Sequence, residues 1–240
     1  MRASVASSQT QTSGVALSDA SFVRFGGLAG ILLALTSLVT VAVFYTVVPE
    51  AQRQPTGDVN PYLASLAKDS FGSQLFYGLY ALIAVWALVG IVAVYYRVRS
   101  AGEAWAFFAT LVGAVAAIAT IVPNVYQLAN LRYLASVYTS DPKLAATLYQ
   151  APSPSNPVGL MTFALTGVWF LIAATLMLRT SLPRLVAYLG YVAFADLLFG
   201  FVVSLLGIST LATVAGLIAG VVGGPLFWVW LGVLLWRQQE

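Results

Sequence analysis

Residues 25–48 read FGGLAGILLALTSLVTVAVFYTVV, a run of 24 residues without one charged side chain. An α-helix of this length spans roughly 36 Å, which exceeds the hydrocarbon core of a bilayer at about 30 Å. Five further apolar runs are also long enough to cross, and they cover residues 71–96, 105–129, 157–178, 185–206 and 212–236. The sequence therefore predicts an all-α, polytopic membrane bundle of six transmembrane helices within residues 21–240.

The composition supports this prediction. Hydrophobic residues make up 60% of the chain and charged residues 8%, and the mean hydropathy is +0.89. Soluble domains carry about 25% charged residues, so most of this surface must face lipid or other protein. The net charge of +3 comes from basic residues that flank apolar runs, without the basic face that nucleic acid requires. The expected partner is the lipid bilayer, not nucleic acid.

The absence of two residue types limits the chemistry. The chain has no Cys and no His, which removes thiolate and imidazole metal sites, the usual haem ligands and Ser–His pairs. The sequence also offers no paired carboxylates at helical spacing and no acidic cluster for a hard metal. We therefore predict that the chain is not an enzyme and has no catalytic residue, metal site or cofactor.

The basic residues beside the spans predict the orientation, because cytoplasmic loops carry an excess of Lys and Arg. One side holds Arg2, Arg24, Arg97, Arg99, Arg179, Arg184 and Arg237, and the other holds Arg53, Lys68, Arg132 and Lys143. This bias predicts a protein of the cytoplasmic (inner) membrane with both termini in the cytoplasm. Residues 1–20 are rich in Ser, Thr, Gln and Ala, and we expect a flexible cytoplasmic tail there.

The two longer loops each contain a helix-start signal. Asn60 and Asp141 are N-cap residues in these signals, and a proline follows each at the first helical position. Apolar residues recur at helical spacing after both, which predicts short amphipathic helices on the outer surface of the bilayer. These helices either cap the bundle or dock a partner.

The even-numbered spans end alike, with Val-Trp followed by Arg. The copies are Val85-Trp86 with Arg97, Val168-Trp169 with Arg179, and Val229-Trp230 with Arg237. They suggest three related helical hairpins, although Trp and Arg are common at any cytoplasmic boundary.

Asp196 lies about 11 residues into the fifth span, near the middle of the bilayer. Ionisable residues are expensive at this depth and usually face a cavity or a partner. The small residues Ala193 and Gly200 on the same helix face would admit another helix or a ligand. No basic residue lies in a span at matching depth, so we expect Asp196 to be protonated. It is either a proton, ion or ligand site or a neutral hydrogen-bonding group inside the bundle.

Thr120, Asn124 and Gln127 share one face of the third span, beside Pro123, which predicts a kink. By depth, Thr120 lies one turn further out than Asp196. If the two helices meet, these side chains line a polar pocket that opens outward. The other possibility is hydrogen bonding between helices near the membrane boundary.

Small residues recur every four positions in the sixth span and, more weakly, in the first. They are Ala212, Gly216, Gly220 and Gly224, and then Gly26 and Gly30. Such spacing lets helices pack backbone to backbone. We predict packing inside the bundle or against a neighbouring subunit, with a hinge at Gly223-Gly224-Pro225 as the functional alternative.

Strings at the span ends carry a resemblance. RFGGLAG (24–30) opens the first span, LPR (182–184) and YLGY (188–191) open the fifth, and WLGVLLWR (230–237) closes the sixth. With these strings the chain resembles a broad group of uncharacterised bacterial six-helix integral membrane proteins that share a domain of unknown function. The resemblance implies a six-helix fold in a bacterial membrane and supplies no active residue.

Three functional hypotheses follow. The first is an accessory or scaffolding subunit of a larger membrane assembly, or a homo-oligomer, that acts through helix–helix contacts. The alternative is a small transporter or channel with Asp196 as its protonatable element and Thr120, Asn124 and Gln127 as its polar lining. The third is a membrane enzyme acting on lipid, which the lack of a second carboxylate within the spans disfavours.

Overall fold

The computed structural model describes residues 19–53, 58–151, 161–208, 211, 214, 216 and 218–237, and over these residues the chain is all-α. Four helices are long and apolar enough to cross a membrane. They are α1 (Asp19–Thr46), α4 (Phe71–Val98), α5 (Glu103–Ser140) and α8 (Arg184–Leu205). Two shorter apolar helices, α7 (Thr166–Met177) and α10 (Gly224–Arg237), pack among them. The prediction of an all-α protein with several membrane-length helices is confirmed.

A π-helical segment leads into each of the two shorter helices. The segment η3 (Met161–Leu165) precedes α7, and η4 (Ile218–Gly223) precedes α10. Such segments are rare and occur frequently at functional sites. Within a membrane, irregular backbone is tolerated where it is buried in protein or lines a cavity. These two segments are therefore candidates for the walls of a cavity inside the bundle.

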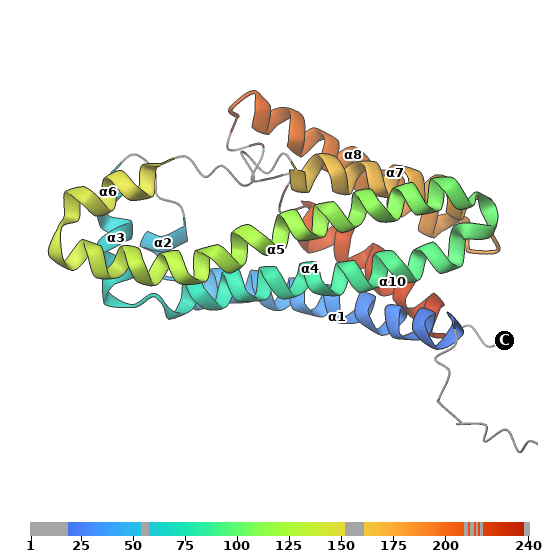
Figure 1. Cartoon of the computed structure of the whole chain (residues 1–240), viewed down its shortest axis with the longest axis horizontal. Coiled ribbons are helices and arrows are strands. Elements are labelled where there is room, and N and C mark those ends of the chain that lie inside the picture. Colours follow the sequence, from blue (N-terminus) through green and yellow to red (C-terminus); the bar gives the residue numbers. More distant parts are fainter. Residues whose placement is uncertain are drawn as a thin grey trace, which may run out of the picture.

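The helices run roughly lengthwise through the molecule (Figure 1). α4 packs between α1 and α5, α7 packs on α5 and α8, and α10 crosses α1 obliquely. The beginning of α1 and the end of α10 lie together at what we call the terminal end. The short helices α2 (Glu50–Arg53), α3 (Asn60–Lys68) and α6 (Pro142–Gln150) lie at the opposite, capped end (Figure 1).

Glycines bring the helices into backbone contact near the terminal end. A Cβ added to Gly232 of α10 would lie 2.6 Å from the carbonyl oxygen of Gly27 in α1. Gly26 packs directly on Ala93 of α4, and a Cβ on Gly30 would lie 3.0 Å from the carbonyl oxygen of Trp228. The small residues of the first span thus pack inside the bundle, as one of the two predicted possibilities had it.

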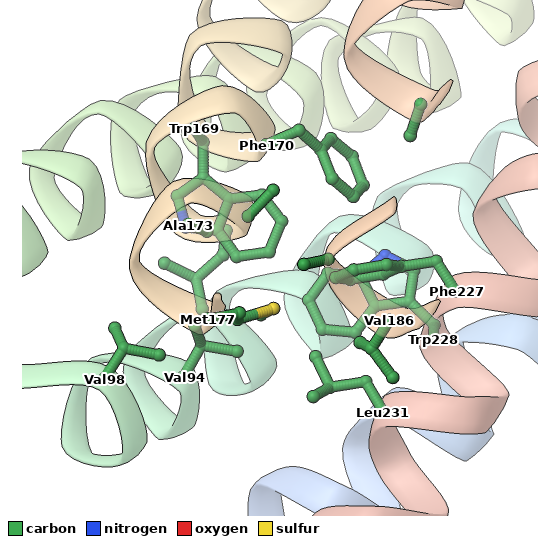
Figure 2. Packing of buried hydrophobic residues seen from close by; sticks show 14 of the residues in the cluster. Val94, Val98, Trp169, Phe170, Ala173, Met177, Val186, Phe227, Trp228 and Leu231 are labelled. Carbon is green, nitrogen blue, oxygen red and sulfur yellow. The ribbon is translucent and has the colours of Figure 1, made fainter. Parts of the chain in front are cut away.

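A buried aromatic cluster joins α7 to α10 (Figure 2). The rings of Trp169 and Trp228 are stacked, with centroids 5.5 Å apart and an interplanar angle of 8°. Phe170 and Phe227 meet edge to face beside them, with centroids 4.9 Å apart. Trp169 is only 1% exposed. This cluster closes the interior of the bundle on its terminal side.

The capped end has its own small core, built on the second half of α5. Tyr62, Leu63 and Leu66 of α3 are buried there with Leu131 and Leu134 of α5. The third span was predicted to end near residue 129, but the helix continues to Ser140 because α3 and α6 pack against this extension. Protein therefore covers the apolar face of α3, whereas Leu144 and Leu148 of α6 remain exposed.

The two predicted helix starts behave differently. The Asp141 side chain accepts a hydrogen bond from the Leu144 amide, 3.0 Å away, so its prediction as an N-cap is confirmed. The N-cap prediction for Asn60 is wrong. Asn60 is the first helical residue of α3, and its amide donates to the Asp58 carboxylate at 2.9 Å. An acidic side chain two residues upstream thus satisfies an amide of the first turn.

Polar side chains fasten the cap to the long helices. The Gln52 amide donates to the Asp69 carbonyl at 2.7 Å and accepts from the Ser73 hydroxyl at 2.7 Å. Arg53 donates to the carbonyls of Val48 and Tyr45, which satisfies acceptors at the carboxyl end of α1. The cap is therefore tied by hydrogen bonds to the ends of α1 and α4 that lie beside it.

Two sequence predictions need correction. Asp19 and Ala20, predicted to belong to the tail, lie in the first turn of α1, and residues 1–18 fall outside the described residues. The three tryptophans of the suggested hairpin repeat have unlike surroundings, because Trp169 is buried, Trp86 is half-buried and Trp230 is 43% exposed. Moreover, α10 packs mainly on α1, so described residues of the fifth and sixth spans do not form a close hairpin.

Candidate binding cavity

A cavity of about 430 Å³ lies inside the bundle, between α1, α4, α5, α7, α8 and α10. Trp169, Phe170 and Trp228 line its terminal side. At its capped side it reaches Tyr45 and Tyr80, which are 49% and 39% exposed. The aromatic cluster thus forms the floor of the cavity, and we call the opposite side, among the rings of Tyr45 and Tyr80, the mouth. The volume falls within the range of about 300–1,000 Å³ that is usual for small-molecule sites.

The lining is apolar apart from hydroxyl groups. Among the described residues that line the cavity, none carries a charge. The hydroxyls of the deeper wall belong to Ser37, Thr40, Thr120, Thr162 and Thr166. A charged molecule would enter this space at a large desolvation cost without a counter-ion, whereas a neutral one would not. The cavity therefore favours neutral, mostly apolar molecules.

Most of these hydroxyls already have acceptors. Ser37 donates to the Leu33 carbonyl at 2.9 Å, and Thr40 donates to the Thr36 carbonyl at 2.7 Å. Thr120 donates to the Ala116 carbonyl at 3.0 Å and lies 3.1 Å from the Thr162 hydroxyl. The last contact joins α5 to η3. Thr166 makes no hydrogen bond to another described residue, although its hydroxyl-bearing side chain lines the cavity.

The two π segments border the cavity from opposite helices. Thr162 and Phe163 of η3 line it from one side, and Gly220 of η4 lines it from another. A Cβ built on Gly216 or Gly220 would have no described atom within 4 Å. The absence of side chains at these glycines therefore adds directly to the open space.

The structure brings one of the three predicted polar residues of the third span to the cavity. Thr120 lines it, whereas Asn124 and Gln127 do not. The Asn124 side chain donates to the Thr120 carbonyl at 2.6 Å, so it folds back on its own helix beside Pro123. Gln127 accepts from the Asn130 side chain at 3.3 Å. The side chains of the predicted polar face thus form hydrogen bonds mainly within α5.

Asp196 does not line the cavity, although its helix neighbours Ala193 and Leu197 do. Its Oδ2 atom is buried and has no hydrogen-bond partner among the described residues. α7 and η3 pack between α5 and α8, so the expected pocket between Thr120 and Asp196 does not form. A functional role for Asp196 stays a prediction.

The small-residue stripe of the sixth span also meets the cavity. Gly216, Gly220 and Gly224 line it, and Ala212 lies outside the described residues. The first two make no close contact with another described helix, unlike Gly26 and Gly30. Their use in contacts with a neighbouring subunit remains a prediction.

Sequence reasoning missed the aromatic floor and the mouth. We had no reason to single out Trp169-Phe170 or Phe227-Trp228 from the abundant aromatic residues. A signal was present, because both pairs lie at similar depth in their spans and appear in reverse order. The hydroxyl of Thr166 was also missed, since a lone threonine in a helix usually satisfies itself on its own backbone.

The described residues contain no group of three or more His, Cys, Asp or Glu that would hold a metal ion. Comparison with family models, curated proteins and solved structures finds no match to this chain. The resemblance to the bacterial six-helix group therefore stays a prediction, and the cavity itself is the basis for any functional proposal.

Proposed function

We propose that this chain is a multi-pass membrane protein that binds a small, neutral, mostly apolar molecule inside its helical bundle. The observation that carries the proposal is the uncharged cavity of about 430 Å³ bordered by two π-helical segments. Ligand sites of helical membrane proteins commonly lie beside helices with interrupted backbone near the middle of the bilayer.

The proposal includes six crossings of the bilayer. With their π segments, α7 and α10 extend over residues 161–177 and 218–237, which reaches the roughly 17 residues that a short span needs. The described chain begins and ends at the same end of the molecule, as an even number of crossings requires (Figure 1). Most basic residues of the described chain lie near that end, so we place it in the cytoplasm of a bacterial cell.

The hypothesis of an accessory subunit or homo-oligomer has weaker support. It rested on the lack of catalytic chemistry, the small mass outside the spans and the small-residue packing faces, but Gly26 and Gly30 pack inside the bundle and Gly216 and Gly220 line the cavity. The fully buried packing of the first pair leaves it unavailable to a partner. A stoichiometric partner found in native membranes would restore this hypothesis.

A second candidate function is transport coupled to protons. The observation that favours it is the buried, unpartnered Oδ2 atom of Asp196, one helix position from the cavity residue Leu197. Asp196→Asn should then abolish proton uptake into proteoliposomes that accompanies movement of the ligand, while thermal stability is retained. Unchanged proton uptake would exclude a coupling role. A lipid enzyme has no supporting feature in the cavity.

The binding proposal is tested by filling the cavity. Gly220→Phe places a ring in open space that lines the cavity, and Gly78→Phe is its matched control. A Cβ on Gly78 also meets nothing within 4 Å among described atoms, but Gly78 does not line the cavity.

Protein purified in mild detergent would be examined by native mass spectrometry, and its extracted small molecules by liquid chromatography and mass spectrometry. We expect a stoichiometric neutral compound with the wild type and with Gly78→Phe, and its loss with Gly220→Phe. Equal recovery from both variants would contradict a site in this cavity.

A further inference from the structure

The deep cavity offers hydrogen bonds of two kinds. A hydroxyl that already donates to a carbonyl still has lone pairs with which to accept. Ser37, Thr40 and Thr120 are in this state, because each donates to a backbone carbonyl of its own helix. They present acceptor oxygens to whatever occupies the cavity.

Thr166 differs from these three residues. It is the first residue after the π segment η3, so the preceding turn does not have regular α-helical geometry. Its hydroxyl makes no hydrogen bond within the described part of the chain, so its O–H remains available for donation. An O–H that stays unpaired in an apolar space loses the hydrogen bonds it would make in water. Thr166 therefore supplies a donor deep in the cavity.

The position of Thr166 fixes where a ligand acceptor would lie. Trp169 of the floor follows it by one helical turn, and Phe163 precedes it on the side of the mouth. Tyr45 and Tyr80 line the cavity at its opposite side, toward the capped end. A ligand oxygen bonded to Thr166 would thus sit just above the aromatic floor, with the rest of the molecule extending toward the mouth.

We infer that the ligand is a neutral molecule with a carbonyl oxygen near one end, which accepts a hydrogen bond from Thr166, and with an apolar remainder. This inference rests on the proposed function and names the chemical class of its ligand. Because no described lining residue carries a charge, a carboxylate or phosphate at this position would lack a counter-ion, which disfavours both groups.

The test uses two probes that differ by one group. Benzophenone carries a carbonyl where diphenylmethane carries a methylene, and both are neutral and of similar size. Their affinities would be measured by competition against the compound that copurifies, or by quenching of tryptophan fluorescence, in lipid nanodiscs. Thr166→Val removes the hydroxyl at nearly constant volume. Thr110→Val is the control, because the Thr110 hydroxyl donates to the Ala106 carbonyl and does not line the cavity.

We expect benzophenone to bind the wild type roughly fivefold more tightly than diphenylmethane, as one net hydrogen bond predicts. Thr166→Val should remove this preference, and Thr110→Val should keep it. Ultraviolet irradiation of bound benzophenone should attach it to peptides that contain cavity residues.

Three results would overturn the inference. If the two probes bind with equal affinity and Gly220→Phe blocks both, the cavity binds apolar molecules without the Thr166 donor, and only the carbonyl inference fails. If the preference survives Thr166→Val, another donor is responsible. If Gly220→Phe binds each probe with the same affinity as Gly78→Phe does, the cavity is not the binding site. The proposed function then fails as well.

Discussion

The two ends of the sixth apolar segment use glycine in opposite ways. Near the terminal end, Gly232 brings α10 into backbone contact with Gly27 of α1. Toward the capped end, Gly216 and Gly220 have no described atom within 4 Å of an added Cβ, and they line the cavity. α1 and α10 cross tightly at one level and separate beyond it. A repeated small residue can therefore close one interface and open another along a single segment.

The largest loss of stability is expected from a change in the aromatic floor, which lies between the packed and the open end of the sixth segment. Trp169→Ala should destabilise the protein by about 3–5 kcal/mol, because it deletes a fully buried ring and enlarges the cavity. Trp230→Ala is the matched control, since Trp230 is 43% exposed. Unfolding in a mixed detergent titration would give both values. Equal losses of stability in the two variants would contradict the placement of Trp169 in the buried floor of the cavity.

The tight crossing is tested by Gly232→Ala. The added methyl would lie 2.6 Å from the Gly27 carbonyl oxygen, and this neighbour is backbone that cannot swing aside. Overpacking of this kind typically costs about 1–3 kcal/mol. The melting temperature in detergent should fall clearly below that of the wild type. An unchanged melting temperature would show that α1 and α10 can move apart without penalty.

The cap offers a smaller and more local test. Asp141→Ala removes the side-chain acceptor of the Leu144 amide and should cost about 1 kcal/mol. Asp141→Asn retains an acceptor and should recover most of this loss. Hydrogen exchange of the α6 amides would report the change. The ligand affinity of the cavity should stay as in the wild type, because α6 does not line it.

The smallest effect is expected for Gly220→Ala, the counterpart of Gly232→Ala. The new methyl meets open space, so stability should change by less than about 1 kcal/mol, with a small gain from reduced chain entropy. The same thermal measurement would compare the two variants side by side. A loss as large as that of Gly232→Ala would remove the distinction between the packed and open ends.

Much of the fold could be predicted because membrane spans obey a simple length rule. The apolar runs at 25–48, 71–96 and 185–206 match α1, α4 and α8 within a few residues, apart from an earlier start of α1. The end of α5 was missed because residues 130–140 are too polar for a span. They are helical because α3 and α6 pack on them, and α3 lies far away along the chain, so the local sequence does not encode that contact.

Less of the candidate site could be predicted. Depth placed Thr120 and Asp196 near one another along the membrane normal, but depth does not say which helices are neighbours. α7 and η3 lie between α5 and α8, and Asp196 does not line the cavity although its neighbours Ala193 and Leu197 do. The spacing of glycines likewise does not distinguish a close helix–helix contact from a cavity wall, because small residues are found in both. Whether the neighbouring helix approaches or diverges is decided by the tertiary arrangement.

The length of α5 has a practical consequence. At 38 residues it is roughly 57 Å long, whereas a bilayer with its headgroups is about 40–45 Å thick. An α5 that spans the bilayer with little tilt therefore carries the α3–α6 cap beyond the lipid headgroups as a folded knob. For a particle of 25.4 kDa, that knob is a ready epitope. An antibody fragment bound there would supply the mass and asymmetry that electron cryo-microscopy needs to align single particles and image an occupied cavity.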